Sequence, residues 1–334
     1  MTTQALIVFD MDGVIIDVSG SYRETVRQTS RLFFKGARFW EDLPDPLFSL
    51  SDLAAVKQSG GLNNDWDLTF AVIQLLGRVV KIPKDIEDRD PWSRHRKTIV
   101  QCDVAELIRY LKSSQNPLVN LMKNNRKARK SIISSFYQGD VGSGNIIKQI
   151  FQESYLGKEL FEATYGIPTK FHHSEGYIKK EKLLLEHSFL EHLSDKNILA
   201  IATGRPRAEA DYALDLFDLN QYFTTIYALD DCLREEKRIL EKEGRRVSLA
   251  KPNPFMLDGV AEACQDAVSE YYYVGDMPDD ILAAKRSKTG FVAVGILFSS
   301  PDKDSLKKNL VQAGADHIVD DAAELILLVE SGKS

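Results

Sequence analysis

The feature that most constrains the fold is a set of short apolar runs that alternate with helical patterns in the C-terminal part of the chain. The runs are 5–9 (ALIVF), 198–202 (ILAIA), 271–274 (YYYV), 291–296 (FVAVGI) and 317–319 (HIV). Helical patterns occupy 207–217, 254–267, 279–287, 305–313 and 322–331. A short, continuously apolar run with helices on both sides predicts a buried strand of a parallel sheet. We therefore expect an α/β fold, a three-layer Rossmann-like core with right-handed crossovers.

The segment between the first two runs has a different pattern. It has few β-branched runs and several helical stretches, at 22–34, 68–76 and 104–112. We expect a mostly helical domain at 19–182, inserted into a core made of 1–18 and 183–334. Its two hinges are expected at 17–20 and 176–180.

Charge and cysteine content exclude several classes of protein. The net charge of −6 argues against a general nucleic-acid binder. The basic run 123–130 has no interleaved aromatic residues, which favours a solvated face or loop. Three separated cysteines exclude a full disulfide framework. No run approaches the ~18 apolar residues of a membrane span, and the N-terminus does not resemble a secretory signal. A cytoplasmic protein is the expectation.

Polar residues follow the predicted strands at the points where they end. Asp10 and Asp12 follow the first run, and Thr203, Gly204 and Arg205 follow the second. Asp276, Asp279 and Asp280 follow the third, and ahead of it Lys251 precedes two prolines, Pro252 and Pro254, at an expected helix start. Singly, such residues often serve as turns, helix caps or surface charges. In open parallel sheets, however, ligands bind beyond the carboxyl ends of the strands.

Carboxylates gathered at one sheet edge repel each other unless a cation neutralises them. Mg²⁺ is the hard cation that carboxylate and water ligands suit. A hydroxyl and an ammonium in the same group are suited to a phosphoryl group. The combination predicts Mg²⁺-assisted phosphoryl transfer with a carboxylate nucleophile.

Four motifs in this order resemble those of the haloacid dehalogenase superfamily. They are DMDGV at 10–14, ATGR at 202–205, KPNP at 251–254 and GDMPDD at 275–280. The resemblance is to the phosphatase branch with an inserted helical cap, similar to its subfamily IA, and it implies that 19–182 is the cap. The inserted segment carries no family motif. It and the charged excursion 233–246 are longer than the family pattern leads us to expect.

The resemblance implies a role for each motif residue. Asp10 becomes the nucleophile, and Asp12 the general acid and then the general base. The two-residue spacing of an extended chain puts both side chains on one side. Thr203 and the main-chain N–H of Gly204 bind phosphoryl oxygens, and Lys251 neutralises charge in the transition state.

The resemblance also implies a metal site. Mg²⁺ is expected to be held by Asp10, by the main-chain carbonyl of Asp12 and by Asp276. Asp280, four residues after Asp276, is expected to hold a metal-bound water or Lys251.

Substrate recognition is expected in the stretch GGLNNDWD at 60–67. Asn63, Asn64 and Trp66 are the candidate substrate-binding residues. The alternative is a helix N-terminus capped by Asn64 or Asp65, with Trp66 as a core anchor. Arg205 and Arg207 are expected either to bind a second anionic or hydroxylated group or to form surface salt bridges.

The expected function is therefore a Mg²⁺-dependent phosphomonoester hydrolase that forms an aspartyl-phosphate. The expected substrate is a small phosphorylated metabolite, a sugar or polyol phosphate ahead of a phosphoglycolate-like acid. Two alternatives stay open: a phosphomutase of the β-phosphoglucomutase type, and a regulatory protein that binds a phosphorylated metabolite without turnover. No nucleic-acid or membrane partner is expected, and the sequence does not determine the oligomeric state.

Overall fold

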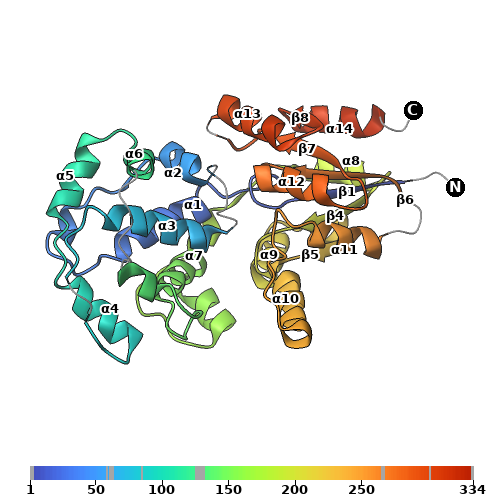
Figure 1. Cartoon of the computed structure of the whole chain (residues 1–334). Coiled ribbons are helices and arrows are strands. Elements are labelled where there is room, and N and C mark those ends of the chain that lie inside the picture. The colour runs from blue at the N-terminus through green and yellow to red at the C-terminus, as the bar shows by residue number, and fades with distance from the viewer. Residues whose placement is uncertain are drawn as a thin grey trace. The chain divides into compact units, whose positions relative to one another are not determined.

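The chain folds into two compact units. The computed structural model describes residues 4–57, 59, 64–83, 86–124, 132–264, 268–300 and 302–331. Unit 1 consists of Met1–Asp17 and Lys182–Ser334, and unit 2 of Val18–Glu181. The elements of both are labelled in Figure 1.

A six-stranded parallel sheet forms the centre of unit 1, with the strand order β5-β4-β1-β6-β7-β8. Its strands are β1 (Gln4–Phe9), β4 (Ile198–Ala202), β5 (Thr225–Tyr227), β6 (Val268–Gly275), β7 (Val292–Ile296) and β8 (His317–Val319). The predicted parallel α/β core is confirmed. The sequence did not predict β5, whose three residues are only half-buried.

Helices cover both faces of this sheet (Figure 1). They are α8 (His187–Ser194), α9 (Arg207–Leu216), α10 (Leu229–Glu243), α11 (Phe255–Ala263), α12 (Pro278–Arg286), α13 (Lys303–Ala313) and α14 (Ala322–Ser331). Side chains alternate between the faces along a strand. Leu6 and Val8 of β1 therefore share a core with Val260 of α11 and other residues of α11–α13. Phe9 belongs to the other face, where its ring meets Phe223 edge-on at 6.2 Å.

A two-stranded ribbon joins the segments by which the chain leaves unit 1 and returns to it. β2 (Ile16–Asp17) pairs antiparallel with β3 (Lys182–Leu183). The departing and returning segments therefore lie side by side.

Unit 2 consists mainly of helices. They are α1 (Tyr22–Leu32), α2 (Leu50–Lys57), α3 (Asp65–Gly77), α4 (Pro91–Ile99), α5 (Ala105–Ser113), α6 (Pro117–Lys123), α7 (Ile146–Tyr165) and the short 3₁₀ turns η1 (Trp40–Asp42), η2 (Ile132–Phe136) and η3 (Tyr177–Lys180). The helix α1 packs against α3 and α7. The helix α7 is kinked at Gly157, whose φ of 74° suits glycine. None of the helices in the described part of the chain has both the length and the apolar character that a membrane crossing requires.

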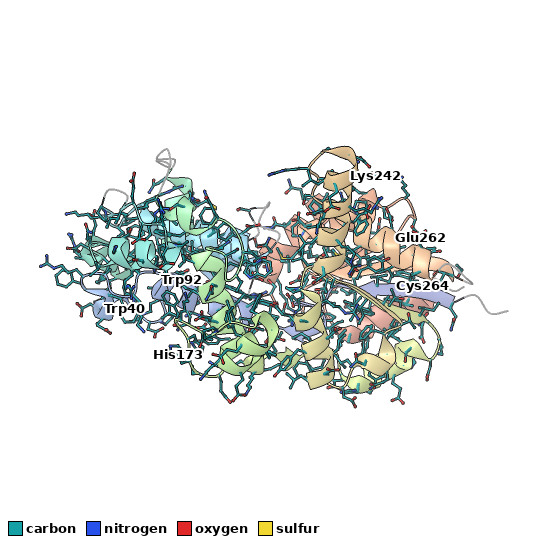
Figure 2. All side chains as sticks on the ribbon, turned by 90° about the horizontal axis from the view of Figure 1, so that it is seen from below. Trp40, Trp92, His173, Lys242, Glu262 and Cys264 are labelled. Atoms are coloured by element: carbon teal, nitrogen blue, oxygen red, sulfur yellow. The ribbon has the colours of Figure 1, made fainter. Side chains whose placement is uncertain are left out.

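The charged excursion ahead of Lys251 is the helix α10. Cys232 and Ile239 face the core, whereas ion pairs such as Arg234–Asp231 (3.0 Å) and Arg238–Glu235 (2.5 Å) lie on its surface. Figure 2 shows Lys242 near the end of this helix. The excursion is a solvated helix that packs against α11.

Candidate active site

Three strands deliver polar residues to one edge of the sheet in unit 1. β1 continues into Asp10, β4 into Thr203 and β6 into Asp276. Phe9 lies opposite Ile201 on one side and Val274 on the other. The neighbouring strands therefore end level with β1, and the amide of Asp10 donates to the carbonyl oxygen of Val274 at 2.9 Å.

Three buried carboxylates, which we call the carboxylate cluster, gather at this edge. Asp10, Asp276 and Asp280 each offer an oxygen atom, and these atoms lie within 4.8 Å of one another. The buried ammonium of Lys251 lies among them, 2.7 Å from Oδ1 of Asp10 and 2.8 Å from Oδ1 of Asp280. Lys251, which the sequence placed ahead of the third strand at an expected helix start, thus contacts residues that follow both the first and the third of these strands.

Burial and charge set the protonation of the cluster. The pKa of Asp10 is raised to about 8: burial is the largest cause, Lys251 opposes the rise, and Asp280, Asp12 and Asp276 contribute to it. Burial alone would lower the pKa of Lys251, but Asp10 and Asp280 raise it well above its ordinary value. Lys251 is therefore charged, and it contacts two of the three carboxyl groups, those of Asp10 and Asp280. A cation beside Asp10 would favour its ionised form.

Asp280 is held by hydrogen bonds at both of its oxygens. Its Oδ1 accepts from Lys251 and from the Tyr273 hydroxyl, at 2.8 and 2.9 Å. Its Oδ2 accepts from the main-chain N–H of Met277 at 3.0 Å, at the start of α12. Of the two contacts expected for Asp280, the structure contains the one with Lys251.

The donor set fits a hard divalent cation. It consists of oxygen atoms and carries more negative charge than Lys251 neutralises, which suits Mg²⁺. The chain also makes room for Asp276: Gly13 has a φ of +77°, and a Cβ there would overlap the Asp276 carboxylate. Ser299 donates to the carbonyl oxygen of Gly13 at 3.2 Å and lies beside the same position. Asp10 and Asp276 are the residues that would hold the ion.

Asp12 is paired with a buried arginine. The Nε of Arg205 donates to Oδ1 of Asp12 at 2.5 Å, and the arginine side chain is fully buried. The Asp12 side chain stays 22% exposed, which leaves it accessible to a ligand. Arg207, in contrast, forms a surface salt bridge with Asp211 at 2.8 Å, one of the two alternatives expected for it. A contact between Arg205 and substrate stays a prediction.

Thr203 and Gly204 form a turn directly after β4. The Thr203 side chain is buried, and its hydroxyl accepts from the main-chain N–H of Arg205 at 3.2 Å. Gly204 is exposed. Thr203 does not cap the next helix, because α9 begins three residues beyond Gly204, after Pro206.

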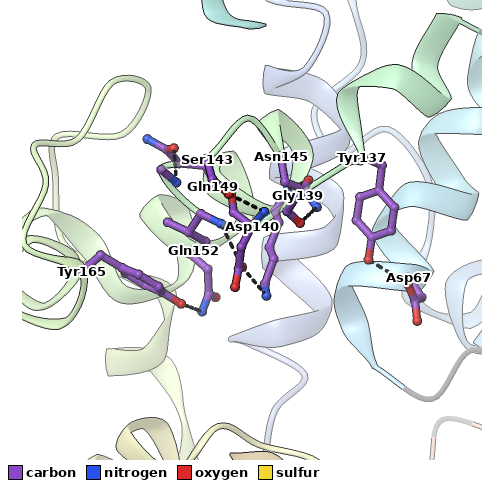
Figure 3. Close-up of polar contacts among 12 residues, drawn as sticks. Asp67, Tyr137, Gly139, Asp140, Ser143, Asn145, Gln149, Gln152 and Tyr165 are labelled. Carbon is purple, nitrogen blue, oxygen red and sulfur yellow. Dashed lines mark hydrogen bonds and ion pairs between the residues drawn. The ribbon is translucent and has the colours of Figure 1, made fainter. Parts of the chain in front are cut away.

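The expected recognition stretch belongs to unit 2, and part of it lies outside the described residues, including Asn63. Asn64 is the N-cap of α3: it accepts from the main-chain N–H of Asp67 at 2.8 Å and donates to its carboxylate at 2.7 Å. The half-buried Trp66 ring lies under the ammonium of Lys148 at 3.9 Å. Tyr137 also donates to Asp67, at 2.7 Å (Figure 3). The alternative of a helix N-terminus capped by Asn64 is confirmed, but Trp66 is half-buried and is not a core anchor. Substrate binding by Asn64 and Trp66 stays a prediction.

Sequence reasoning missed two residues beside the cluster, Tyr273 and Ser299. Tyr273 was assigned to a buried strand, which is correct, but its hydroxyl reaches Asp280. A phenol on a fully buried strand needs a hydrogen-bond partner, and this could have indicated the contact. No sequence signal distinguishes Ser299.

Comparisons with known proteins agree with this geometry. A family model described as haloacid dehalogenase-like hydrolase matches residues 5–288. Pyrophosphatase PpaX of Halalkalibacterium halodurans is 31% identical over 192 residues, which are 51% of this chain and 79% of that protein. An X-ray structure from the Northeast Structural Genomics Consortium has a TM-score of 0.63 and 20% identity, and the match covers 98% of both chains. Phosphatase Tt82 from Thermococcus thioreducens has a TM-score of 0.50 and 20% identity over 92% of this chain and 99% of that one. The two structures share the fold, and the family match shows that this chain belongs to the haloacid dehalogenase-like hydrolases.

Proposed function

We propose that the protein is a Mg²⁺-dependent phosphatase that hydrolyses a small phosphorylated metabolite through an aspartyl-phosphate at Asp10. The observation that carries the proposal is the buried carboxylate cluster around the charged Lys251. Family membership as a hydrolase supports it, and so does the curated relative, which is named a pyrophosphatase.

In the first half-reaction, a carboxylate oxygen of Asp10 attacks phosphorus. The new bond joins Asp10 to phosphorus, and the bond from phosphorus to the leaving oxygen breaks. Asp12 gives its proton to that oxygen, so the product leaves as a neutral alcohol. Arg205 holds the Asp12 side chain beside the sheet edge.

In the second half-reaction, Asp12 takes a proton from water. The water oxygen bonds to phosphorus, the bond to Asp10 breaks, and inorganic phosphate leaves with Asp10 regenerated. Lys251, the Thr203 hydroxyl and the N–H of Gly204 stabilise charge on the phosphoryl oxygens in both steps. Mg²⁺, held by Asp10, Asp276 and the carbonyl of Asp12, would neutralise the same oxygens.

A sugar or polyol phosphate is the proposed substrate, with Asn63, Asn64 and Trp66 of unit 2 as its recognition residues and unit 2 as the cap. Inorganic pyrophosphate is a second candidate, which the name of the curated relative favours. A phosphomutase would use the same residues of unit 1 but would return the phosphoryl group to a second hydroxyl.

A phosphate-release screen tests the proposal. The panel holds an aryl phosphate, sugar and polyol phosphates, phosphoglycolate and pyrophosphate, each with Mg²⁺ and with EDTA. We expect release of phosphate with Mg²⁺, loss of release in EDTA, and one class of metabolite preferred over the others. Full activity in the chelator would contradict the metal assignment. Conversion of a sugar phosphate to its isomer without phosphate release, accelerated by a sugar bisphosphate, would indicate a mutase.

A further inference from the structure

A tyrosine outside the four motifs, Tyr273, packs beside the catalytic lysine, Lys251. We propose that Tyr273 is a positioning residue for phosphoryl transfer, whose hydroxyl fixes Asp280 and, through it, the ammonium of Lys251. The expected effect on kcat rests on the proposed function, whereas the contacts of Tyr273 with Asp280 and Lys251 are independent of it.

The contact between Tyr273 and Asp280 is buried and direct. Tyr273 lies in β6 with 0% exposure, and its hydroxyl donates to Oδ1 of Asp280 at 2.9 Å. The same oxygen accepts from Lys251 at 2.8 Å. One carboxylate oxygen is thus shared by the phenol and the ammonium, and the other is held by Met277.

The phenol also touches the neighbouring strand and the lysine itself. Its oxygen lies 3.3 Å from the carbonyl oxygen of Ala202, the residue before Thr203. The ammonium of Lys251 lies 5.4 Å from the centroid of the tyrosine ring, within the range of a cation–π contact. Tyr273 therefore links the ends of β4 and β6 to the start of α12, beneath Lys251.

The position of Lys251 matters because charge stabilisation depends on geometry. Small displacements of a positioned group lose much of its benefit to a transition state. Without the phenol, Oδ1 of Asp280 would still accept a hydrogen bond from Lys251 but would lose the one from Tyr273, which connects it to strand β6 of the sheet. The lysine and the carboxylate could then shift together, away from Asp10.

The strand provides a matched control in the adjacent tyrosine. Tyr272 is also buried, at 4% exposure, and its hydroxyl also donates to a carboxylate, Glu270, at 2.8 Å. Glu270 is not part of the carboxylate cluster. Tyr272→Phe and Tyr273→Phe each remove one phenol hydroxyl that donates to a carboxylate, and only the second removes a contact with the site.

The kinetic test compares these two variants on the aryl phosphate. We expect Tyr273→Phe to lower kcat about 10-fold, because a hydrogen bond to a charged group is lost, with KM changed less than about 2-fold. Tyr272→Phe should leave both constants unchanged. In an Asp280→Asn background, adding Tyr273→Phe should cost about 2-fold or less, because the hydroxyl acts through Asp280. Equal kcat values for Tyr273→Phe and Tyr272→Phe, or full additivity with Asp280→Asn, would overturn the proposal.

A second readout does not depend on turnover. The exchange of the Lys251 ammonium protons with water can be followed by NMR of the full chain labelled with ¹⁵N-lysine, and a Lys251→Met variant assigns the signal. We expect faster exchange in Tyr273→Phe and wild-type exchange in Tyr272→Phe. Unchanged exchange in Tyr273→Phe would refute the positioning role. If the wild type released no phosphate from any substrate, the proposed function would fail, and this measurement would still decide the role of Tyr273.

Discussion

Buried carboxylates occur in both units, but their surroundings differ. In unit 1, oxygen atoms of Asp10, Asp276 and Asp280 lie within 4.8 Å of one another, and the ammonium of Lys251 contacts two of these residues, Asp10 and Asp280. Their negative charge is only partly neutralised by the protein. Burying uncompensated negative charge destabilises the folded protein unless a bound cation neutralises it.

In unit 2, two buried carboxylates, those of Glu153 and Asp52, are held mainly by main-chain N–H groups. Glu153 of α7 is 0% exposed, and one of its oxygens accepts from three consecutive main-chain N–H groups, those of Lys170, Phe171 and His172, at 2.9, 2.6 and 3.1 Å. Its other oxygen accepts from Gln149 at 2.9 Å. Gln149 lies in the polar network of unit 2 drawn in Figure 3.

Asp52 of α2 follows the same rule. It is 1% exposed and accepts from the main-chain N–H groups of Leu118 and Val119, at 2.8 and 3.1 Å, at the start of α6. Burial of a carboxylate therefore does not by itself indicate an active site. A group of buried carboxylates close to one another is the stronger indication, whereas a carboxylate that accepts from main-chain N–H groups of a helix start or a loop contributes to stability.

The largest expected effect is a loss of activity when a carboxylate of the cluster in unit 1 is replaced. Asp10→Asn should lower kcat by about 10⁴-fold or more, because the amide cannot act as the nucleophile. It should change the melting temperature little, because the weakened ion pair with Lys251 is offset by the removal of one of three mutually repelling carboxylates. Steady-state kinetics and thermal unfolding of the same preparation check both statements. Substantial turnover in Asp10→Asn would remove the nucleophile from the account.

The converse substitution in unit 2 should act on stability. Glu153→Ala leaves three partly buried main-chain N–H groups without their acceptor and should lower the free energy of unfolding by about 3–5 kcal/mol. Glu153→Gln keeps an acceptor and should cost less. Chemical denaturation measures both, and kcat on the folded protein should stay within about 2-fold of the wild type. A loss of kcat with unchanged stability would place Glu153 in the catalytic machinery and break the comparison.

A buried histidine of unit 2 should make stability depend on pH. His95 contacts the carbonyl oxygen of Phe33 through Nε2 at 3.0 Å, and burial lowers its pKa to about 4. An unfolded histidine titrates near pH 6.5, so between these values the unfolded chain binds a proton that the folded chain does not. The free energy of unfolding should therefore fall as the pH falls from about 6.5 to 4, by up to about 3 kcal/mol from this residue. The difference between wild type and His95→Gln across this range isolates the effect, and a constant difference would contradict it.

The smallest effects concern Asn64. Asn64→Ala removes the N-cap of α3 and should cost about 1 kcal/mol of stability. Asn64→Asp keeps a cap acceptor but loses the amide donor. If Asn64 also binds substrate, Asn64→Asp should lower kcat/KM for the metabolite about 2- to 12-fold and spare the aryl phosphate. Equal kcat/KM ratios for both substrates in wild type and Asn64→Asp would leave Asn64 as a cap alone.

The sequence predicted those parts of the molecule that depend on local patterns. The strand at Ile198–Ala202 and the helix at Ala322–Ser331 have the predicted bounds, because apolar runs and helical periodicity determine them. The strand β5 escaped prediction because Thr225–Tyr227 is short and lies at the sheet edge, where no apolar run is required.

The part of the candidate site that lies at the strand ends was predictable from the sequence. Asp10, Thr203 and Asp276 follow buried strands, and parallel strands end at one edge. The contact of Lys251 with Asp280 was expected from the family resemblance alone, and the contact of Arg205 with Asp12 was not predicted. Both depend on how loops and helix starts pack, and no spacing rule connects such positions. For the same reason, the partners of Asp52 and Glu153 could not be derived from the sequence.

The central claim is that the carboxylate cluster of unit 1 is a phosphoryl-transfer centre with Asp10 as the nucleophile. A single turnover with the preferred substrate and Mg²⁺, quenched in acid and analysed by peptide mass spectrometry, tests it most directly. We expect a transient phosphoryl group on the peptide that contains Asp10, stable in acid, labile in base and absent from Asp10→Asn. A phosphoryl group on another residue, or complete turnover that passes through no phosphoenzyme, would contradict it.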